Sequence, residues 1–432
     1  MRETQYGSMI LPDGEYYSLD SFKTRLNNNV MVVGTSGASK TRSMVTPNLL
    51  ECTGSYIVTD PKGNLYKQWG AYMKANGYDV LRVSFIHPEQ SVKYNPLTYV
   101  NTTQEIQQLS HTLVYNGYRG QEKMDPFWDQ QALMLLNSVI AIAKSDTLPK
   151  QPYGEIANFR IMLLYLKLMA KGNSEDGTTK FTRILDNYLR KSKKDQWAVG
   201  QFDCVNQAPN RTFDSIVSTV VAKLSSFDTD EINSMMEENN IDFASIGQKK
   251  TAVFVEVSDS DRSMDLLVNI FFTQAMNALC TYADEKCRDS RLPVPVRFIM
   301  DDFATNCKIS NFDNMISNIR SRNISAMLIL QSFAQLEKGY GESAGTIKDN
   351  CDTLVYMGGN DVNTAHEIAI RANKTTNTIL EMPVCTSWIF RRGSKPVKCA
   401  TMELDDYLAG RGITLSKTIE ESSKKDDGRE AA

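Results

Sequence analysis

Short apolar runs alternate with longer mixed stretches between residues 30 and 85. The runs VMVVG (30–34), SYIVTD (55–60) and DVLRVSF (79–85) have the length and β-branched content of buried strands. The stretches 41–51 and 64–76 between them have the length and composition of helices. Strands that alternate with helices predict a parallel sheet that helices cover on both faces.

The pattern changes after about residue 102. As far as about residue 245, apolar residues recur at spacings of three and four, as in NFRIMLLYLKLMAKG, and no convincing strand is evident. Apolar runs then resume, and strands are expected at 251–258, 295–302, 325–332, 352–359 and near 387–392, with a helix over 263–285. This order predicts an α/β domain that an all-α domain interrupts.

These changes of pattern set the predicted boundaries. We expect an N-terminal lead (1–29), a discontinuous α/β domain (30–102 and 246–413), an all-α domain (103–245) and a polar tail (414–432). The tail has too few apolar residues to form a core, so its composition predicts disorder.

Composition narrows the class of protein. A chain of 432 residues with 41% apolar and 23% charged residues fits a soluble globular protein of two domains. Its net charge of −3 gives no overall attraction to nucleic acid or anionic membrane, so any surface for a polyanion must be local or shared between subunits. Eight cysteines without a C-x-x-C pair, with three histidines, indicate reduced thiols in a cytosolic compartment. The apolar stretch 132–143 is too short to span a membrane, and the N-terminus does not resemble a signal peptide.

The clearest chemical motif follows the first strand, in GTSGASKT at 34–41. It is close to G-x-x-x-x-G-K-[ST], in which backbone N–H groups surround phosphates at a helix N-terminus. Lys40 is placed to reach the β and γ phosphates, and Thr41 to hold magnesium. Ser39 replaces the last glycine but keeps its N–H. The predicted nucleotide-binding residues are Gly34, Thr35, Ser36, Gly37, Ala38, Ser39, Lys40 and Thr41; the alternative is an ordinary tight turn.

A second motif is the pair of acids that ends VRFIMDD. A carboxylate at Asp301 could bind magnesium through water, and Asp302 could orient or deprotonate the attacking water. Many such enzymes have a glutamate at the second position, and aspartate is one methylene shorter. A solvated acidic turn is the alternative. With the loop, the acids predict a site for ATP and Mg²⁺.

Three further side chains fit the same chemistry. Gln331, at the end of LILQ, is placed to touch a γ-phosphate or the water, or simply to bond the backbone. Arg320 and Arg322 precede that strand and could reach the ATP of a neighbouring subunit, or lie free on the surface.

Seven pieces of sequence occur in order between residue 30 and about residue 360: VVGTSGASKTRSMVTPNLL, IVTDPKGNLY, YNPLTYV, DPFWDQQALMLL, PVRFIMDDFATN, IRSRNISAMLILQSFAQL and NCDTLVYMGGND. Together they resemble the type IV secretion coupling proteins of the VirD4/TraG family, most closely those of conjugative elements of Gram-positive, Firmicutes-type bacteria. The resemblance covers about three quarters of the chain.

The resemblance implies a RecA-like P-loop motor domain that carries an all-α domain. Such proteins assemble as hexameric, ATP-driven rings at the cytoplasmic side of a secretion channel, receive a relaxase–DNA complex and help to pass single-stranded DNA. It implies that Lys40 and Thr41 bind nucleotide and magnesium, and that Asp301 is the acid of the second motif. It also implies that Gln331 is a sensor-like glutamine and Arg320 an arginine that acts across the subunit interface. The all-α domain would meet the relaxosome, and a secretion-channel ATPase or a small membrane partner would dock the ring at the inner face of the membrane.

The chain departs from the family pattern in two ways. Ser39 and Asp302 put the rate of hydrolysis in doubt more than the binding of nucleotide. Many members begin with two transmembrane helices, which this sequence lacks. Either it is a naturally soluble branch that a small membrane partner recruits, which we expect, or the chain is truncated.

Two other functions remain open. One is a docking module that recruits relaxosome proteins with little or no hydrolysis, and the substituted positions favour it. The other is a chromosomal DNA pump of the FtsK type, against which the helical insertion counts. Basic runs that could bind DNA, or could be solvated surface, are Lys191, Lys193 and Lys194, and Arg391, Arg392, Lys395 and Lys398.

Overall fold

The computed structural model describes residues 7–115, 126–148, 156–171, 178–303 and 308–413. The chain forms two compact units, each described here by itself. The first comprises residues 1–86, 242–262 and 275–432, and the second residues 87–241 and 263–274. The predicted disordered tail, 414–432, lies outside the described residues.

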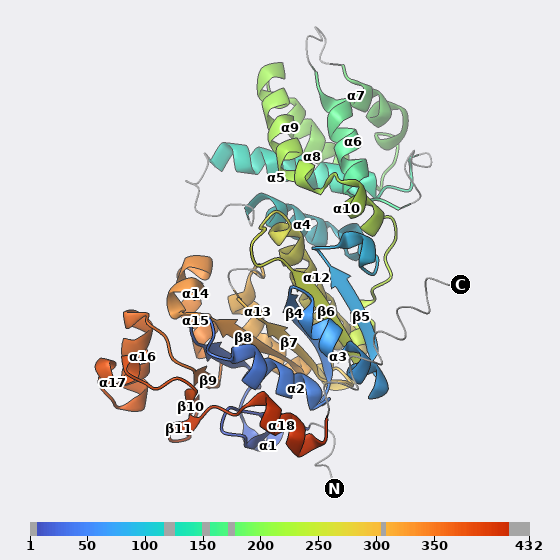
Figure 1. Ribbon diagram of the computed structural model, residues 1–432. Coiled ribbons are helices and arrows are strands. Elements are labelled where there is room, and N and C mark those ends of the chain that lie inside the picture. Colours follow the sequence, from blue (N-terminus) through green and yellow to red (C-terminus); the bar gives the residue numbers. More distant parts are fainter. Residues whose placement is uncertain (1–6, 116–125, 149–155, 172–177, 304–307, 414–432) are drawn as a thin grey trace. The chain divides into compact units, whose positions relative to one another are not determined.

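The first unit is built on one large sheet (Figure 1). In its described part the sheet has nine strands in the order β11-β10-β9-β3-β8-β7-β4-β6-β5. Every pairing from β9 to β5 is parallel, and β10 and β11 add an antiparallel edge. The predicted α/β class with a mainly parallel sheet is confirmed. The strands are β3 (Val30–Val33), β4 (Ser55–Pro61), β5 (Asp79–Ser84), β6 (Thr251–Val257), β7 (Val296–Met300), β8 (Ile324–Leu330), β9 (Thr353–Tyr356), β10 (Thr386–Arg391) and β11 (Val397–Ala400).

Both faces of the sheet are buried, which explains why its strands read as continuous apolar runs. All residues of β3, β6, β7 and β8 are buried. One face packs against α2 (Thr46–Leu50), α3 (Asn64–Ala75) and α18 (Leu404–Arg411), which contribute Leu49, Trp69 and Leu408 to a common core. Figure 1 shows α12 (Asp265–Lys286) and α13 (Phe312–Asn318) on the opposite face.

The N-terminal lead is part of this core. A hairpin of β1 (Ser8–Ile10) and β2 (Tyr16–Ser18) lies against α2, where Ile10 N–H donates to Asn48 Oδ1 at 3.1 Å. Asn48 Nδ2 returns a hydrogen bond to Ile10 O at 2.8 Å. Because this buried amide satisfies both backbone groups of Ile10, the hairpin is held in one position on α2.

The second unit contains helices and no strand among its described residues. They include α4 (Thr103–Tyr115), α5 (Pro126–Ala143), α6 (Phe159–Met169), α7 (Lys180–Ile184), α8 (Gln196–Asn206), α9 (Asn210–Leu224) and α10 (Asp230–Met235). Their apolar faces pack together, with Leu135, Phe159 and Phe213 fully buried. The spacing of three and four residues in the sequence reflects this packing.

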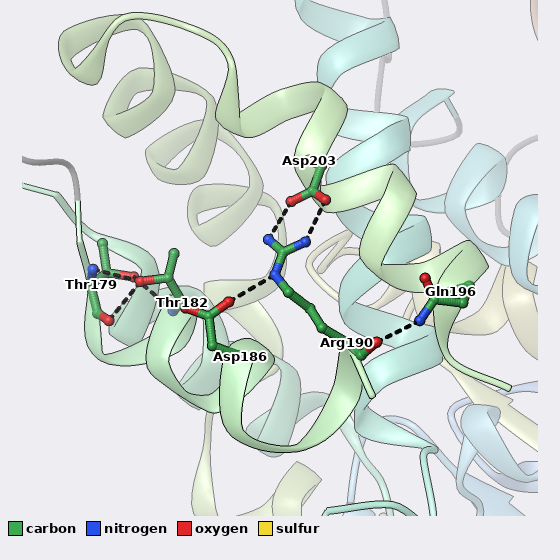
Figure 2. Close-up of polar contacts among 6 residues, drawn as sticks. All are labelled: Thr179, Thr182, Asp186, Arg190, Gln196 and Asp203. Carbon is green, nitrogen blue, oxygen red and sulfur yellow. Dashed lines mark hydrogen bonds and ion pairs between the residues drawn. The ribbon is translucent and has the colours of Figure 1, made fainter. Parts of the chain in front are cut away.

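A charged network joins two helices of this unit (Figure 2). Arg190 follows a π-helical turn at Leu185–Leu189 and donates twice to Asp203 of α8, at 2.7 Å each. Its Nε also donates to Asp186 at 2.8 Å. A two-pronged guanidinium–carboxylate pair fixes orientation better than a single contact, so it sets how the turn meets α8.

Helix α12 is, among the described residues, the one helix long and apolar enough to cross a membrane by length and composition alone. Its most apolar window is 61% buried inside the protein, as in a core helix. Buried core helices of soluble proteins meet the same criterion.

Candidate active site

The candidate site lies at the carboxyl edge of the parallel sheet. In the order β3-β8-β7, the loop at 34–40 follows β3, Gln331 follows β8, and the pair Asp301 and Asp302 follows β7. Since the carboxyl ends of parallel strands meet at one edge, residues far apart in sequence come together there.

Backbone hydrogen bonds anchor the start of the loop. Gly34 N–H donates to Leu330 O at 3.1 Å, and Thr35 N–H donates to Gly358 O at 3.0 Å. A Cβ on Gly34 would lie 3.0 Å from the Cβ of Met357, which is too close to be accommodated without movement. The loop therefore follows a defined path between β8 and the segment after β9.

Ser39 has a backbone conformation that favours glycine. Its φ is +60°, in the left-handed region, as is that of Gly37 at +81°. Ser39 O accepts hydrogen bonds from Ser43 N–H at 2.9 Å and Ser43 Oγ at 2.8 Å. The chain thus forms the curled loop with a serine at this position, at the cost of some backbone strain.

The helix after the loop begins with a widened turn. A π-helical segment covers Thr41–Val45, where Thr46 N–H donates to Thr41 O, and α2 continues from it. Pro47 has no N–H, and its ring would clash with the carbonyl of Ser43, so the widened turn relieves the crowding.

Lys40 folds back over the loop. Its Nζ donates to Gly34 O at 2.6 Å and to Thr35 O at 2.9 Å. Burial lowers the pKa of Lys40, whereas the charges of Asp301 and Asp302 act in the opposite direction. The ammonium group therefore occupies the concave side of the loop, where a phosphate would attract it.

Thr41 and Asp301 meet across 260 residues of sequence. Thr41 Oγ1 donates to Asp301 Oδ2 at 3.0 Å. Burial, followed by the charge of Asp302, raises the pKa of Asp301, and the bond from Thr41 and the charge of Lys40 only partly offset this rise. A hydroxyl and a carboxylate oxygen in contact are the hard ligands that suit Mg²⁺, so the donor set fits this ion.

Asp302 and Gln331 form a second contact beside the first. Gln331 Nε2 donates to Asp302 Oδ1 at 3.2 Å, and Asp302 N–H donates to Asp301 Oδ1 at 3.0 Å. Asp302 has a φ of +49°. Its carboxylate thus contacts the amide of Gln331, and its backbone is bonded to Asp301, the partner of Thr41.

The sequence did not single out two residues of β4 that support this cluster. Thr59 Oγ1 accepts the N–H of Asp301 at 2.6 Å, which fixes the turn after β7. Asp60 is fully buried and accepts the N–H groups of Leu65 and Tyr66 at 2.9 and 2.8 Å, at the start of α3. Burial raises the pKa of Asp60 to about 6. The available signal was TD at the end of an apolar strand, the same pattern that identified the two acids of β7.

Arg320 and Arg322 lie away from this cluster. They form a 3-10 turn, Ile319–Arg322, that precedes β8, at the opposite edge of the sheet from the loop. Arg320 is exposed, and its Nη2 donates to Ser21 O at 3.1 Å. Arg322 pairs with Asp284 of α12 at 2.7 Å. Within one chain the structure therefore does not bring Arg320 to the predicted nucleotide site, and its action on a neighbouring subunit stays a prediction.

Some of the basic residues proposed for DNA have partners within the chain. Arg392 pairs with Asp352 at 2.5 Å, and Arg391 lies over the ring of Tyr17, 4.3 Å from its centre. Lys194 pairs with Asp146 at 3.3 Å, both side chains being largely exposed. The pair of arginines thus ties β10 to the lead and to the start of β9.

Comparisons with known proteins place this geometry in context. The model of the family Type IV secretory system Conjugative DNA transfer matches residues 4–387. No curated protein matches the chain significantly.

Solved structures show the same fold at low sequence identity. The bacterial conjugative coupling protein TrwBdeltaN70, in a trigonal form with sulphate, has a TM-score of 0.66 and 14% identity, covering 91% of this chain and 89% of its own. TrwB in complex with the non-hydrolysable ATP analogue ADPNP has a TM-score of 0.64 and 13% identity, covering 92% and 89%. VirB4 of Thermoanaerobacter pseudethanolicus has a TM-score of 0.57 and 14% identity, covering 92% and 96%. The predicted RecA-like P-loop fold is confirmed by this likeness.

Proposed function

Because the chain belongs to the type IV secretory system conjugative DNA transfer family, we propose that it is an ATP-driven coupling protein. In this role it links a relaxase–DNA complex to a secretion channel and helps to drive single-stranded DNA through it by ATP hydrolysis. The observation that carries the proposal is the contact of Thr41 with Asp301 beside Lys40 at the edge of the sheet.

ATP is held by the loop at 34–41 in this proposal. Lys40 exchanges its bonds to Gly34 O and Thr35 O for phosphate oxygens, and its desolvated charge strengthens that contact. Thr41 and Asp301 hold Mg²⁺, which supplies neutralising charge to the β and γ phosphates when bound. The structures of TrwB with ADPNP and with ADP and Mg²⁺ support this choice of ligands.

Hydrolysis needs a water aligned with the γ-phosphate. Asp302 is bonded to Asp301, one of the proposed magnesium ligands, and contacts Gln331, so in this proposal Asp302 orients or deprotonates the water and Gln331 responds to the γ-phosphate. Arg320, exposed at the opposite edge of the sheet, acts on the ATP of the neighbouring subunit in a homo-hexameric ring.

The partners follow from the same proposal. The helical unit receives the relaxosome, and the ring lies on the cytoplasmic side of the cell membrane, where a secretion-channel ATPase or a small membrane partner docks it. Single-stranded DNA binds without sequence preference, through charge gathered from several subunits, since one chain carries a net charge of only −3. We expect DNA affinity to fall steeply with added salt; binding that is selective for sequence and insensitive to salt would contradict this.

The test is the release of phosphate from ATP with and without single-stranded DNA, in the intact chain and in Lys40→Ala. We expect turnover that DNA stimulates in the intact chain and that Lys40→Ala abolishes. Turnover no higher than that of Lys40→Ala under both conditions would refute the motor.

A second function is a docking module with weak hydrolysis. The observations that favour it are the left-handed backbone at Ser39 and Asp302 and the short side chain of Asp302. It predicts nucleotide binding without DNA-stimulated turnover, together with capture of relaxosome proteins that Lys40→Ala does not weaken. A binding assay run beside the phosphate assay separates the two functions.

A further inference from the structure

A small cavity lies at the amino edge of the sheet, at the opposite ends of the strands from the loop at 34–41. It is lined by the first residues of β4, β7 and β8 and by Leu19, Ser21 and Asn28 of the lead. Its volume is about 30 Å³. A single water needs roughly 10–15 Å³ on this measure, so the cavity can hold a group somewhat larger than one water.

Arg297 of β7 is the unusual residue of this cavity. Only 6% of its surface is exposed, and it stands in register between Tyr56 of β4 and Ser325 of β8. Its Nε donates to Ser325 Oγ at 3.3 Å. In the described part of the chain no carboxylate pairs with its guanidinium and none lines the cavity.

Such an arrangement leaves a positive charge without compensation. Burial lowers the pKa of Arg297, yet a guanidinium keeps its proton in proteins. Buried charges in folded proteins are ordinarily paired or hydrogen-bonded, because an isolated buried charge loses its hydration and gains no interaction that replaces it. Arg82 of the same unit is compensated in this ordinary way, since it donates to both oxygens of the buried Glu256 at 2.7 and 3.0 Å.

The other groups around the cavity are suited to an oxygen-rich anion. Ser325 Oγ accepts from Arg297, so its own proton is available to a ligand. Arg320 also lines the cavity and uses one amino group on Ser21 O, which leaves its other donors for a ligand. Two guanidinium groups and a hydroxyl can satisfy several oxygens of one small anion.

We propose that this cavity is a binding site for a small free oxyanion of the size of inorganic phosphate, held by Arg297, Arg320 and Ser325. The occupant is a free ion because the cavity is too small for a nucleotide and is bordered by the lead. A bound anion would neutralise Arg297. It would also link the lead to the large sheet of the first unit, because Arg320, which would hold the anion, is bonded to Ser21 of the lead.

The test measures thermal unfolding as phosphate replaces chloride at constant ionic strength. It is carried out in the Lys40→Ala background, because the loop at 34–41 is itself expected to bind phosphate. We expect the unfolding midpoint to rise by roughly 3–6 °C at ten times the dissociation constant, and to keep rising with the logarithm of concentration. An unfolding midpoint that is the same in chloride and in phosphate would overturn the proposal.

Two further substitutions in that background locate the effect. Arg297→Met keeps an unbranched side chain that can pack in the sheet but removes the guanidinium group and its charge, so it should remove the phosphate response. Arg291→Met is the matched control, because Arg291 lies nearby, bonded to Asn323 at 3.2 Å, but does not line the cavity. It should keep the full response. An equal response in both variants would assign the effect to general screening and overturn the site.

A direct measurement covers the case in which Arg297→Met does not fold. Calorimetric titration of the Lys40→Ala chain with phosphate should show saturable binding that Arg320→Gln weakens at least several-fold. Absence of binding, or binding unchanged by Arg320→Gln, would contradict the proposal. An unfolding midpoint that rises with protein concentration but does not change with phosphate would indicate that a carboxylate of a second copy of the chain occupies the cavity. This result would also overturn the proposal of a free oxyanion.

Discussion

The change Ser39→Gly tests whether this serine strains the phosphate loop. Ser39 has a φ of +60°, and its hydroxyl makes no hydrogen bond within the described part of the structure. A left-handed conformation costs a residue with a Cβ about 1–2 kcal/mol. Glycine removes that cost but adds about 0.5–1 kcal/mol of entropy to the unfolded chain.

The difference predicts a gain in stability of about 0.5–1 kcal/mol for Ser39→Gly. The matched control is Ser36→Gly in the same loop, where φ is negative. Glycine there relieves nothing and should destabilise by about 0.5–1 kcal/mol. Denaturant unfolding of the parent and both variants measures the two changes in unfolding free energy. The comparison requires that unfolding free energy falls with denaturant concentration at the same slope in all three.

Nucleotide affinity provides the second measurement on these variants. Ser39 contributes its N–H to the loop, and glycine keeps that group, so the affinity of Ser39→Gly for an ATP analogue should equal or exceed that of the parent. If Ser39→Gly loses as much stability as Ser36→Gly, the idea of relieved strain is wrong, and the backbone at this position prefers the serine.

Three further predictions concern the same unit. Thr59→Val removes the acceptor for Asp301 N–H, so it should lower the free energy of unfolding by about 1–3 kcal/mol. It should also lower Mg²⁺-dependent nucleotide affinity, because Thr59 positions Asp301; an unchanged dependence on Mg²⁺ would contradict this positioning role. The pKa of Asp60 is raised to about 6 in the folded chain, so the folded state holds this proton more tightly and loses stability as pH rises from about 4 to above 6. Asp60→Asn should therefore gain up to about 2–3 kcal/mol over the parent between these pH values, measured as the difference in unfolding free energy; a constant difference would refute the raised pKa. Arg320→Ala and Lys40→Ala should each lack DNA-stimulated hydrolysis, yet a mixture of the two should regain part of it if the arginine acts between subunits; no recovery in mixed rings would count against that action.

Much of the first unit could be predicted from the sequence because its polar motifs lie directly after strand ends. The apolar runs at β3, β7 and β8 stand out since both faces of a parallel sheet are buried. The residues that follow them are polar because they border an open edge. The α/β class was therefore predicted correctly, and the loop and the acids that spacing singled out lie in contact through Thr41 and Asp301; their role in nucleotide binding stays a prediction.

The order of the strands could not be predicted from the sequence. The apolar pattern within a strand is the same whichever strands pair with it. Only the tertiary structure places β8 between β3 and β7, and with it Gln331 between the loop and the acids. The same holds for Thr59, whose hydroxyl matters only because β4 pairs with β7.

The sequence by itself determined the type of fold, the phosphate loop and the acids that face it, since each depends on residues within a few positions of one another. The tertiary structure alone decided which of them touch, as in the contact of Thr41 with Asp301. It also decided that Arg297, the one charged residue of an apolar strand, is buried and that no carboxylate of the described residues pairs with it. Burial and the choice of neighbours depend on packing between distant segments, and no single segment of the sequence contains that information.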